Sequence, residues 1–145
     1  MVKPTVVVGF DASPESAPAL RFATEEAQLR HARLLVVTAY DRPIDPDLDD
    51  FDIPDSNLKE AARARAEKAL HLTLGRPPES GVHVDIVAAE REPSRVLLEH
   101  GGAAIMIVVG SHDRPMLQRL FGRPTVCGLL HGSAVPITIV PSVLH

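Results

Sequence analysis

Short apolar runs alternate with longer amphipathic segments along the whole chain. Thr5–Val8 is β-branched, ends at Gly9 and has no polar alternation, which is typical of a strand buried on both faces of a parallel sheet. In 82–88, polar residues alternate with apolar ones, which predicts a strand nearer the sheet edge with one more exposed face. Five strands are predicted, at residues 5–8, 34–40, 82–88, 105–109 and 136–140.

Helical patterns fill the segments between these strands. Ser13 is a good N-cap and Pro14 suits the first position of a helix, while Gly75 suits the C-cap of the second helix. Helices are predicted at 14–31, 56–75 and 93–100, and at 124–132 with an interruption at Gly128. Strands that alternate with helices indicate parallel strands with helical crossovers on both faces. The fold class is therefore α/β, in a single domain over residues 1–145.

Composition excludes several classes of protein. The longest apolar run, Ala103–Val109, has seven residues, whereas a membrane span needs ~20. Aromatic residues make up 3% and the net charge is -4, which argues against base-stacking platforms and basic nucleic-acid interfaces. The lone Cys127 fits a reducing compartment, and no signal peptide is visible. We expect a cytoplasmic protein with no membrane and no nucleic-acid partner.

The net charge conceals two local imbalances. Residues 41–55 contain seven Asp and one Arg, a net of -6. Residues 110–125 contain Asp113 against Arg114, Arg119 and Arg123, a net of +2. The basic segment is either an anion site or a solvated loop, and charge alone does not distinguish the two.

Two loops are candidates for a ligand site. In an open α/β sheet, ligands bind beyond the carboxyl ends of the strands, and segments 9–13 and 110–123 follow the first and fourth strands. If those strands are neighbours, both loops open into one crevice. Asp11 is then an acceptor for a ribose hydroxyl or an adenine amino group. In the alternative interpretation, Asp11 and Ser13 only cap a helix.

The second loop has the chemistry of a phosphate site. Gly110 permits close backbone approach, and Gly122 stands at the start of a helix, where amides and the helix dipole attract phosphate. Arg123 adds charge and Thr125 a hydroxyl. The alternative is that both glycines are ordinary turn residues. His112 also lies in this loop, but no Ser or Cys partner is apparent, and the seven His have no metal-ligand spacing. We assign no catalytic residue and no metal.

Segments 8–20, 107–112 and 135–140 resemble the universal stress protein family, and the likeness covers nearly the whole chain. The resemblance implies an open parallel sheet of order 3-2-1-4-5. It also implies that Asp11 meets the adenosine, that Ala39 and Val109 lie beside the base, and that Gly110 and Gly122 lie near the phosphates.

The glycine motif of the family's ATP-binding branch is altered here. That motif is Gly-x2-Gly-x9-Gly-(Ser/Thr), and only Gly110 matches it. Asp113 and Arg123 stand where the other two glycines belong, and Pro124 replaces the Ser or Thr. Asp113 brings negative charge toward a phosphate, and Pro124 removes an amide donor. The adenosine half of the site is therefore better preserved than the phosphate half.

These features together predict a stress-response regulatory module that binds ATP or another adenine nucleotide between the loops after strands one and four. One alternative is a dimeric interaction protein that binds no nucleotide, and another is a weak ATP hydrolase. The resemblance also implies a homodimer that pairs its last strands, for which the apolar edge at Pro136, Ile137, Thr138, Ile139 and Val140 is suited.

Overall fold

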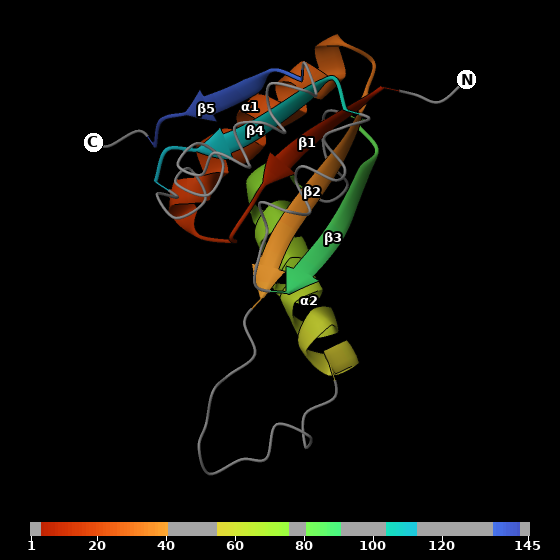
Figure 1. Ribbon diagram of the computed structural model, residues 1–145, viewed down its shortest axis with the longest axis vertical. Coiled ribbons are helices and arrows are strands. Elements are labelled where there is room, and N and C mark those ends of the chain that lie inside the picture. Colours follow the sequence, from red (N-terminus) through yellow and green to blue (C-terminus); the bar gives the residue numbers. More distant parts are fainter. Residues whose placement is uncertain (1–3, 41–54, 76–80, 91–103, 113–134, 143–145) are drawn as a thin grey trace.

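The computed structural model describes residues 4–40, 55–75, 81–90, 104–112 and 135–142. Within them lies a five-stranded sheet in the order β3-β2-β1-β4-β5, with every neighbouring pair parallel (Figure 1). The predicted fold class and strand order are confirmed. The strands are β1 (Thr5–Gly9), β2 (Arg33–Tyr40), β3 (Val84–Glu90), β4 (Met106–Gly110) and β5 (Ile137–Val140).

Burial follows the sequence pattern from the centre of the sheet to its edges. Val6, Val7 and Val8 of β1 are completely buried, as continuous apolar runs require in a central parallel strand. The edge strand β3 exposes Asp85 and Glu90. It begins and ends two residues later than predicted, because its register with β2 runs from Leu34↔Val84 to Tyr40↔Glu90. The bounds of β3 are therefore set by its pairing with the long strand β2 and not by the local alternation of polar and apolar residues.

Two helices cover the same face of the sheet, α1 (Ala17–Leu29) and α2 (Asp55–Leu74) (Figure 1). Leu20 of α1 and Leu70 of α2 join Val8 and Val36 in one buried cluster. The other face of the sheet carries a second cluster, built on Val7, Val37, Ala89, Ile107 and Val109. The helices predicted at 93–100 and 124–132 lie outside the described residues.

The ends of α1 correct the predicted bounds of 14–31. A 3-10 turn, η1 (Pro14–Ser16), precedes the α-helix, and the side chain of Ser13 makes no capping hydrogen bond. At the other end His31 has φ 53°, and the amides of His31 and Ala32 donate to the carbonyls of Gln28 and Ala27. This is a Schellman termination. Gly75 ends α2 as predicted, with φ 90°.

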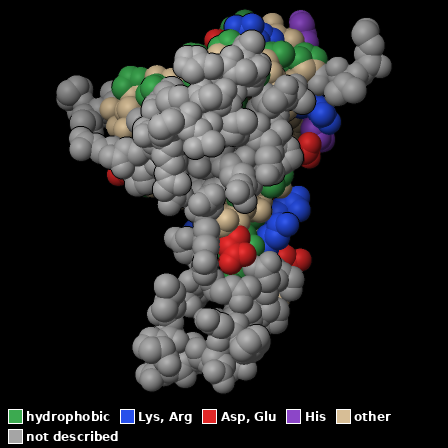
Figure 2. Space-filling view, viewed as in Figure 1, with side chains coloured by type: hydrophobic (Ala, Val, Ile, Leu, Met, Phe, Trp, Pro, Cys, Tyr) green, Lys and Arg blue, Asp and Glu red, His purple; other side chains and the backbone are tan. Residues whose placement is uncertain are grey.

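The outer surface of α2 is polar. Figure 2 shows Lys and Arg side chains beside Asp and Glu side chains over this helix, which fits the exposure of Lys59, Glu60, Arg63 and Glu67. Among the α2 residues whose burial is described, only a narrow stripe is fully buried, formed by Ala62, Ala66 and Leu70. Within the described segments, no helix combines the length and the apolar character that a membrane crossing demands.

Candidate functional site

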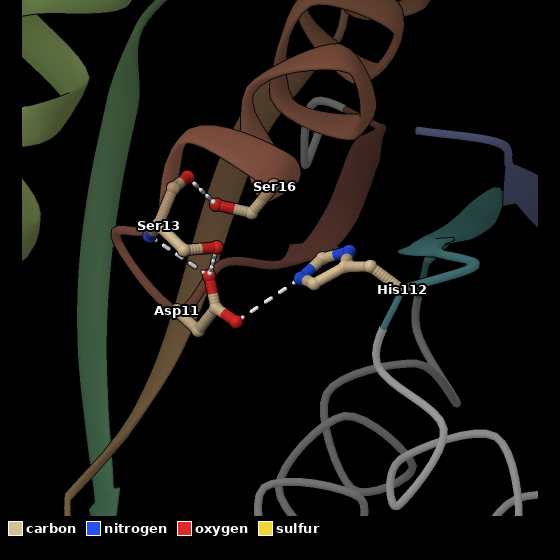
Figure 3. A network of polar contacts seen from close by, with 4 residues as sticks. All are labelled: Asp11, Ser13, Ser16 and His112. Carbon is tan, nitrogen blue, oxygen red and sulfur yellow. Dashed lines mark hydrogen bonds and ion pairs between the residues drawn. The ribbon is translucent and has the colours of Figure 1, made fainter. Parts of the chain in front are cut away.

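The loops that follow β1 and β4 meet through two side chains. Because β1 and β4 are adjacent and parallel, their carboxyl ends lie together at one edge of the sheet. Asp11 and His112 each stand two residues beyond the end of their strand, and His112 Nε2 lies 3.0 Å from Asp11 Oδ2 (Figure 3). The predicted crevice between the two loops is therefore closed at this point by a direct polar contact.

The second oxygen of the Asp11 carboxylate is held by its own loop. The Ser13 amide donates to Asp11 Oδ1 at 2.9 Å, and the Ser13 hydroxyl donates to the same oxygen. The Ser16 hydroxyl donates to the Ser13 carbonyl at 2.7 Å (Figure 3). Ser13 stands at the predicted N-cap position, with φ -79° and ψ 156°, but its side chain makes no capping hydrogen bond. Its hydroxyl turns back to Asp11, an alternative that short polar side chains readily adopt in loops.

The backbone around Asp11 is fixed on both sides. Phe10 is buried, and its amide donates to the Val37 carbonyl at 2.9 Å, which extends the β1 ladder by one residue. Ala12 has φ 65°, a left-handed conformation that costs a non-glycine residue roughly 1–2 kcal/mol. The contacts of the Asp11 carboxylate with Ser13 stabilise that turn, so Asp11 shapes the loop in addition to presenting an acceptor.

The surroundings of Asp11 favour its ionised form. Partial burial raises the pKa of Asp11, but the hydrogen bonds from the Ser13 hydroxyl and amide lower it, and His112 and Ser16 lower it further. The net result is a pKa below the ordinary value of 3.8. The Asp11 side chain is 44% exposed, so the carboxylate is a pre-formed acceptor that solvent or a ligand can reach.

Gly110 provides the space in which the His112 ring lies. A Cβ at position 110 would come 2.6 Å from His112 Nδ1 and 2.7 Å from Cε1. Ser111 anchors the same turn to β5, since its amide donates to the Val140 carbonyl at 2.9 Å and its hydroxyl accepts from the Ser142 amide. The start of the loop after β4 is thus fixed toward β5 by Ser111 and toward β1 by His112.

The Asp11–His112 pair is not arranged for general-base catalysis. A base needs a free nitrogen within reach of a water or substrate proton. His112 Nε2 is engaged by Asp11, and Nδ1 is buried beside Gly110 with no hydrogen-bond partner among the described residues. Neither nitrogen can accept a proton from a bound water in this arrangement.

The described segments offer little else as a ligand site. No three His, Cys, Asp or Glu side chains gather there in a way that could hold a metal ion. A hollow of about 290 Å³ lies between the end of β2 and α2. It contains none of the predicted site residues, being lined by Tyr40, Leu58, Ala61, Ala62 and Arg65.

Comparison with known proteins agrees with this architecture. A family model described as the universal stress protein family matches residues 4–141. The chain belongs to the universal stress protein family. The universal stress protein Rv2005c of Mycobacterium tuberculosis is 30% identical over 138 residues, which cover 92% of this chain and 44% of that protein. The chain therefore spans less than half the length of this relative.

Solved universal stress proteins share the fold. One from Burkholderia pseudomallei has 27% identity and a TM-score of 0.63, and the match covers 96% of both chains. A universal stress protein in complex with cAMP has 23% identity and a TM-score of 0.55, with coverage of 99% of this chain and 100% of that one. The protein from Archaeoglobus fulgidus in complex with dAMP has 22% identity and a TM-score of 0.54, with coverage of 97% and 99%.

The site residues expected from the universal stress protein resemblance fall into two groups. Asp11, Ala39, Val109 and Gly110 are described, and all lie at the carboxyl ends of β1, β2 and β4. Ala39 is half-buried and Val109 is buried, and strand alternation places both on the face that carries Val7 and Val37. The expected phosphate residues Gly122, Arg123 and Thr125 lie outside the described residues, as do Asp113 and Pro124.

Sequence reasoning about this universal stress protein missed the partner of His112. The search was for a nearby Ser or Cys nucleophile, whereas the partner is a carboxylate 101 positions earlier in the chain. Asp11 and His112 occupy equivalent positions, because each stands two residues after the Gly that ends an apolar strand. This equivalence could have identified Asp11 as the partner.

Proposed function

We propose that this chain is a regulatory module that binds an adenine nucleotide between the loops after β1 and β4. The observation that carries the proposal is the Asp11 carboxylate, ionised, partly exposed and held by Ser13 and His112 at the meeting point of these loops. Ligands of open α/β sheets bind at such a point, where the strand order reverses. Here the reversal falls between β1 and β4.

The adenosine would lie across the ends of the central strands. Asp11 accepts a hydrogen bond from the ribose or from the adenine amino group, while Ala39 and Val109 present small apolar surfaces to the base. On the phosphate side we assign Gly110, Gly122, Arg123 and Thr125. Asp113, Arg123 and Pro124 alter the glycine motif there, so we expect the nucleoside part to contribute more binding free energy than the phosphates.

The ligands of two proteins of the same fold support an adenine nucleotide. One was solved with cAMP and another with dAMP, and both ligands carry a single phosphate. A nucleotide with few phosphates also fits a chain whose phosphate motif is altered while its Asp11 is retained. We place this activity in the cytoplasm, in keeping with a chain that has one Cys.

We also propose that the chain forms a homodimer through the outer edge of β5. The two sheet edges differ in chemistry. The edge strand β3 carries Asp85 and Glu90, and Asp85 Oδ2 lies 3.2 Å from His83 Nε2. Charged side chains on an edge strand deter edge-to-edge pairing. β5 has no charged residue and leaves Ile139 44% exposed. The apolar edge is therefore the better surface for a second copy.

A dimeric interaction protein that binds no nucleotide is the second candidate. It is favoured by the altered glycine motif and by the three donors that already contact the Asp11 carboxylate. The hydrolase alternative is weaker, because neither nitrogen of His112 is free to activate a water.

Thermal unfolding with a panel of nucleotides separates the candidates. Purified protein is melted alone and with millimolar AMP, cAMP, ADP and ATP with magnesium, and the supernatant of acid-precipitated protein is chromatographed for released nucleotide. We expect an increase in Tm with at least one adenine nucleotide and a smaller or no increase with the guanine analogue. An unchanged Tm with every nucleotide, together with no released nucleotide, would leave the interaction protein as the function.

A further inference from the structure

The acceptor capacity of Asp11 is nearly used up by protein donors. A carboxylate offers about four lone-pair positions. The Ser13 amide and hydroxyl take both positions on Oδ1, and His112 Nε2 takes one on Oδ2. The Ser16 hydroxyl is near enough to help lower the pKa of Asp11, but its single proton is donated to the Ser13 carbonyl, so it takes no further acceptor position on the carboxylate. One acceptor position therefore remains, on Oδ2, and the side chain is exposed enough for a ligand to reach it.

A ribose presents two neighbouring hydroxyl donors at its 2′ and 3′ positions. A carboxylate accepts from both only when two of its lone-pair positions are free. With His112 in place, Asp11 accepts from one hydroxyl, and the second hydroxyl gains no bond there. The number of sugar hydroxyls that Asp11 recognises thus depends on whether His112 keeps its contact.

The His112 ring is held firmly enough to make this restriction effective. It packs against Gly110 in a space that a Cβ would fill, its Nδ1 is buried, and only 18% of its side chain is exposed. The residue before it, Ser111, is fixed to β5 through its amide. Rotation of the ring away from Asp11 would lose a charge-assisted hydrogen bond, a kind about twice as strong as a neutral one.

We propose that His112 sets the sugar selectivity of the nucleotide site by leaving Asp11 a single acceptor position for the ligand. This inference rests on the proposed function and gives it a chemical consequence. The site accepts adenine nucleotides with one free sugar hydroxyl near Asp11, and the 2′-deoxy or the 3′-deoxy form binds as well as the ribonucleotide.

The test measures the affinities of AMP, 2′-deoxy-AMP and 3′-deoxy-AMP by calorimetry for the full chain and three variants. In the wild type, one deoxy form is expected to bind within about twofold of AMP and the other about tenfold more weakly, the value of one hydrogen bond to a charged group. In His112→Ala the second position is open, so AMP gains affinity and both deoxy forms become about tenfold weaker than AMP.

Two matched variants guard against indirect effects. His112→Gln keeps a donor near the position of Nε2 and is expected to restore the wild-type ratios. His83→Ala removes a similar His–Asp contact on the remote edge of β3 and is expected to leave the ratios unchanged.

The outcomes separate this inference from the proposed function. The inference is overturned, while nucleotide binding stands, if the wild type discriminates against both deoxy forms or against neither. It is also overturned if His112→Ala shows the same affinity ratios as the wild type. If AMP does not bind the wild type at all, the proposed function fails and the inference falls with it.

Discussion

The imidazole of His112 joins the carboxylate of Asp11 across two loops that are 101 positions apart in sequence, with 3.0 Å between Nε2 and Oδ2. Each residue lies two positions beyond the end of a central strand, so the contact follows from the adjacency of β1 and β4. The contact fixes the position of the Asp11 carboxylate, which we propose accepts a hydrogen bond from the ligand. It also occupies one of the lone-pair positions of that carboxylate.

The lowered pKa of Asp11 makes stability depend on pH in acid. Because the pKa is lower in the folded than in the unfolded chain, the contribution of Asp11 to stability is present above an unfolded pKa of about 3.9. It is lost as the pH falls through the folded pKa. Urea unfolding of wild type and Asp11→Asn from pH 7 to pH 3 is therefore expected to give a free-energy difference that shrinks below about pH 4. A difference that stays constant or grows in acid would contradict this assignment.

Substitution of Gly110 acts through His112. In Gly110→Ala the new Cβ meets the His112 ring at 2.6 Å, so the ring moves and the contact with Asp11 is lost. The backbone at Gly110 is outside the left-handed region, and conformational strain adds nothing. We expect a loss of about 1–2 kcal/mol in the free energy of unfolding, and a much smaller loss when the same change is made in His112→Ala. Equal losses in the two backgrounds would show that Gly110 does not act through the ring.

Thr38 offers a stabilising substitution. It is 1% exposed, and its hydroxyl has no hydrogen-bond partner among the described residues. Strand alternation places it on the helix-covered face with Val36. Replacing a buried, unpaired hydroxyl with a methyl group removes its desolvation cost, so Thr38→Val is expected to raise the free energy of unfolding by about 1–2 kcal/mol. Chemical denaturation checks this value, and a decrease in stability would indicate that the hydroxyl has a favourable contact after all.

The proposed dimer is tested at the exposed edge of the sheet. Ile139→Lys places a charge on β5, and like charges facing one another across a two-fold axis oppose pairing. Sedimentation velocity is expected to give a dimer for the wild type and a monomer for this variant. Leu72→Lys is the matched control, because Leu72 is 81% exposed on α2 and lies away from the edge. Dissociation by the control alone would place the interface on α2 instead.

The pattern of apolar positions was enough to predict five parallel strands, whereas their order was predicted from the family resemblance. Val6, Val7 and Val8 and the run 106–109 are continuous because both faces of these strands are covered, and that signal is local. The bounds of β3 were two residues off because they depend on pairing with β2, which no local pattern records. Where pairing with a neighbouring strand sets the bounds of a strand, the strand's own sequence is not enough to predict those bounds.

The site was predictable only in part, for a similar reason. Asp11 was identified from its position after a strand, and so was the loop that starts at Gly110. Ser13 occupies the predicted N-cap position, but its hydroxyl donates to Asp11 and makes no capping bond to a helix amide. The partner of His112 depended on the strand order, which brings distant residues together. Tertiary contacts of this kind are outside the reach of spacing arguments.

The most direct test of the account is a calorimetric titration of AMP, and of ATP with magnesium, into the wild-type chain and into Asp11→Asn. We predict saturable binding of one nucleotide per chain in the wild type. In the variant, whose amide cannot replace an ionised acceptor, we predict about tenfold weaker binding. A flat titration of the wild type at millimolar nucleotide, or equal affinity in the two proteins, would contradict the assignment of Asp11 as the central contact of an adenine-nucleotide site.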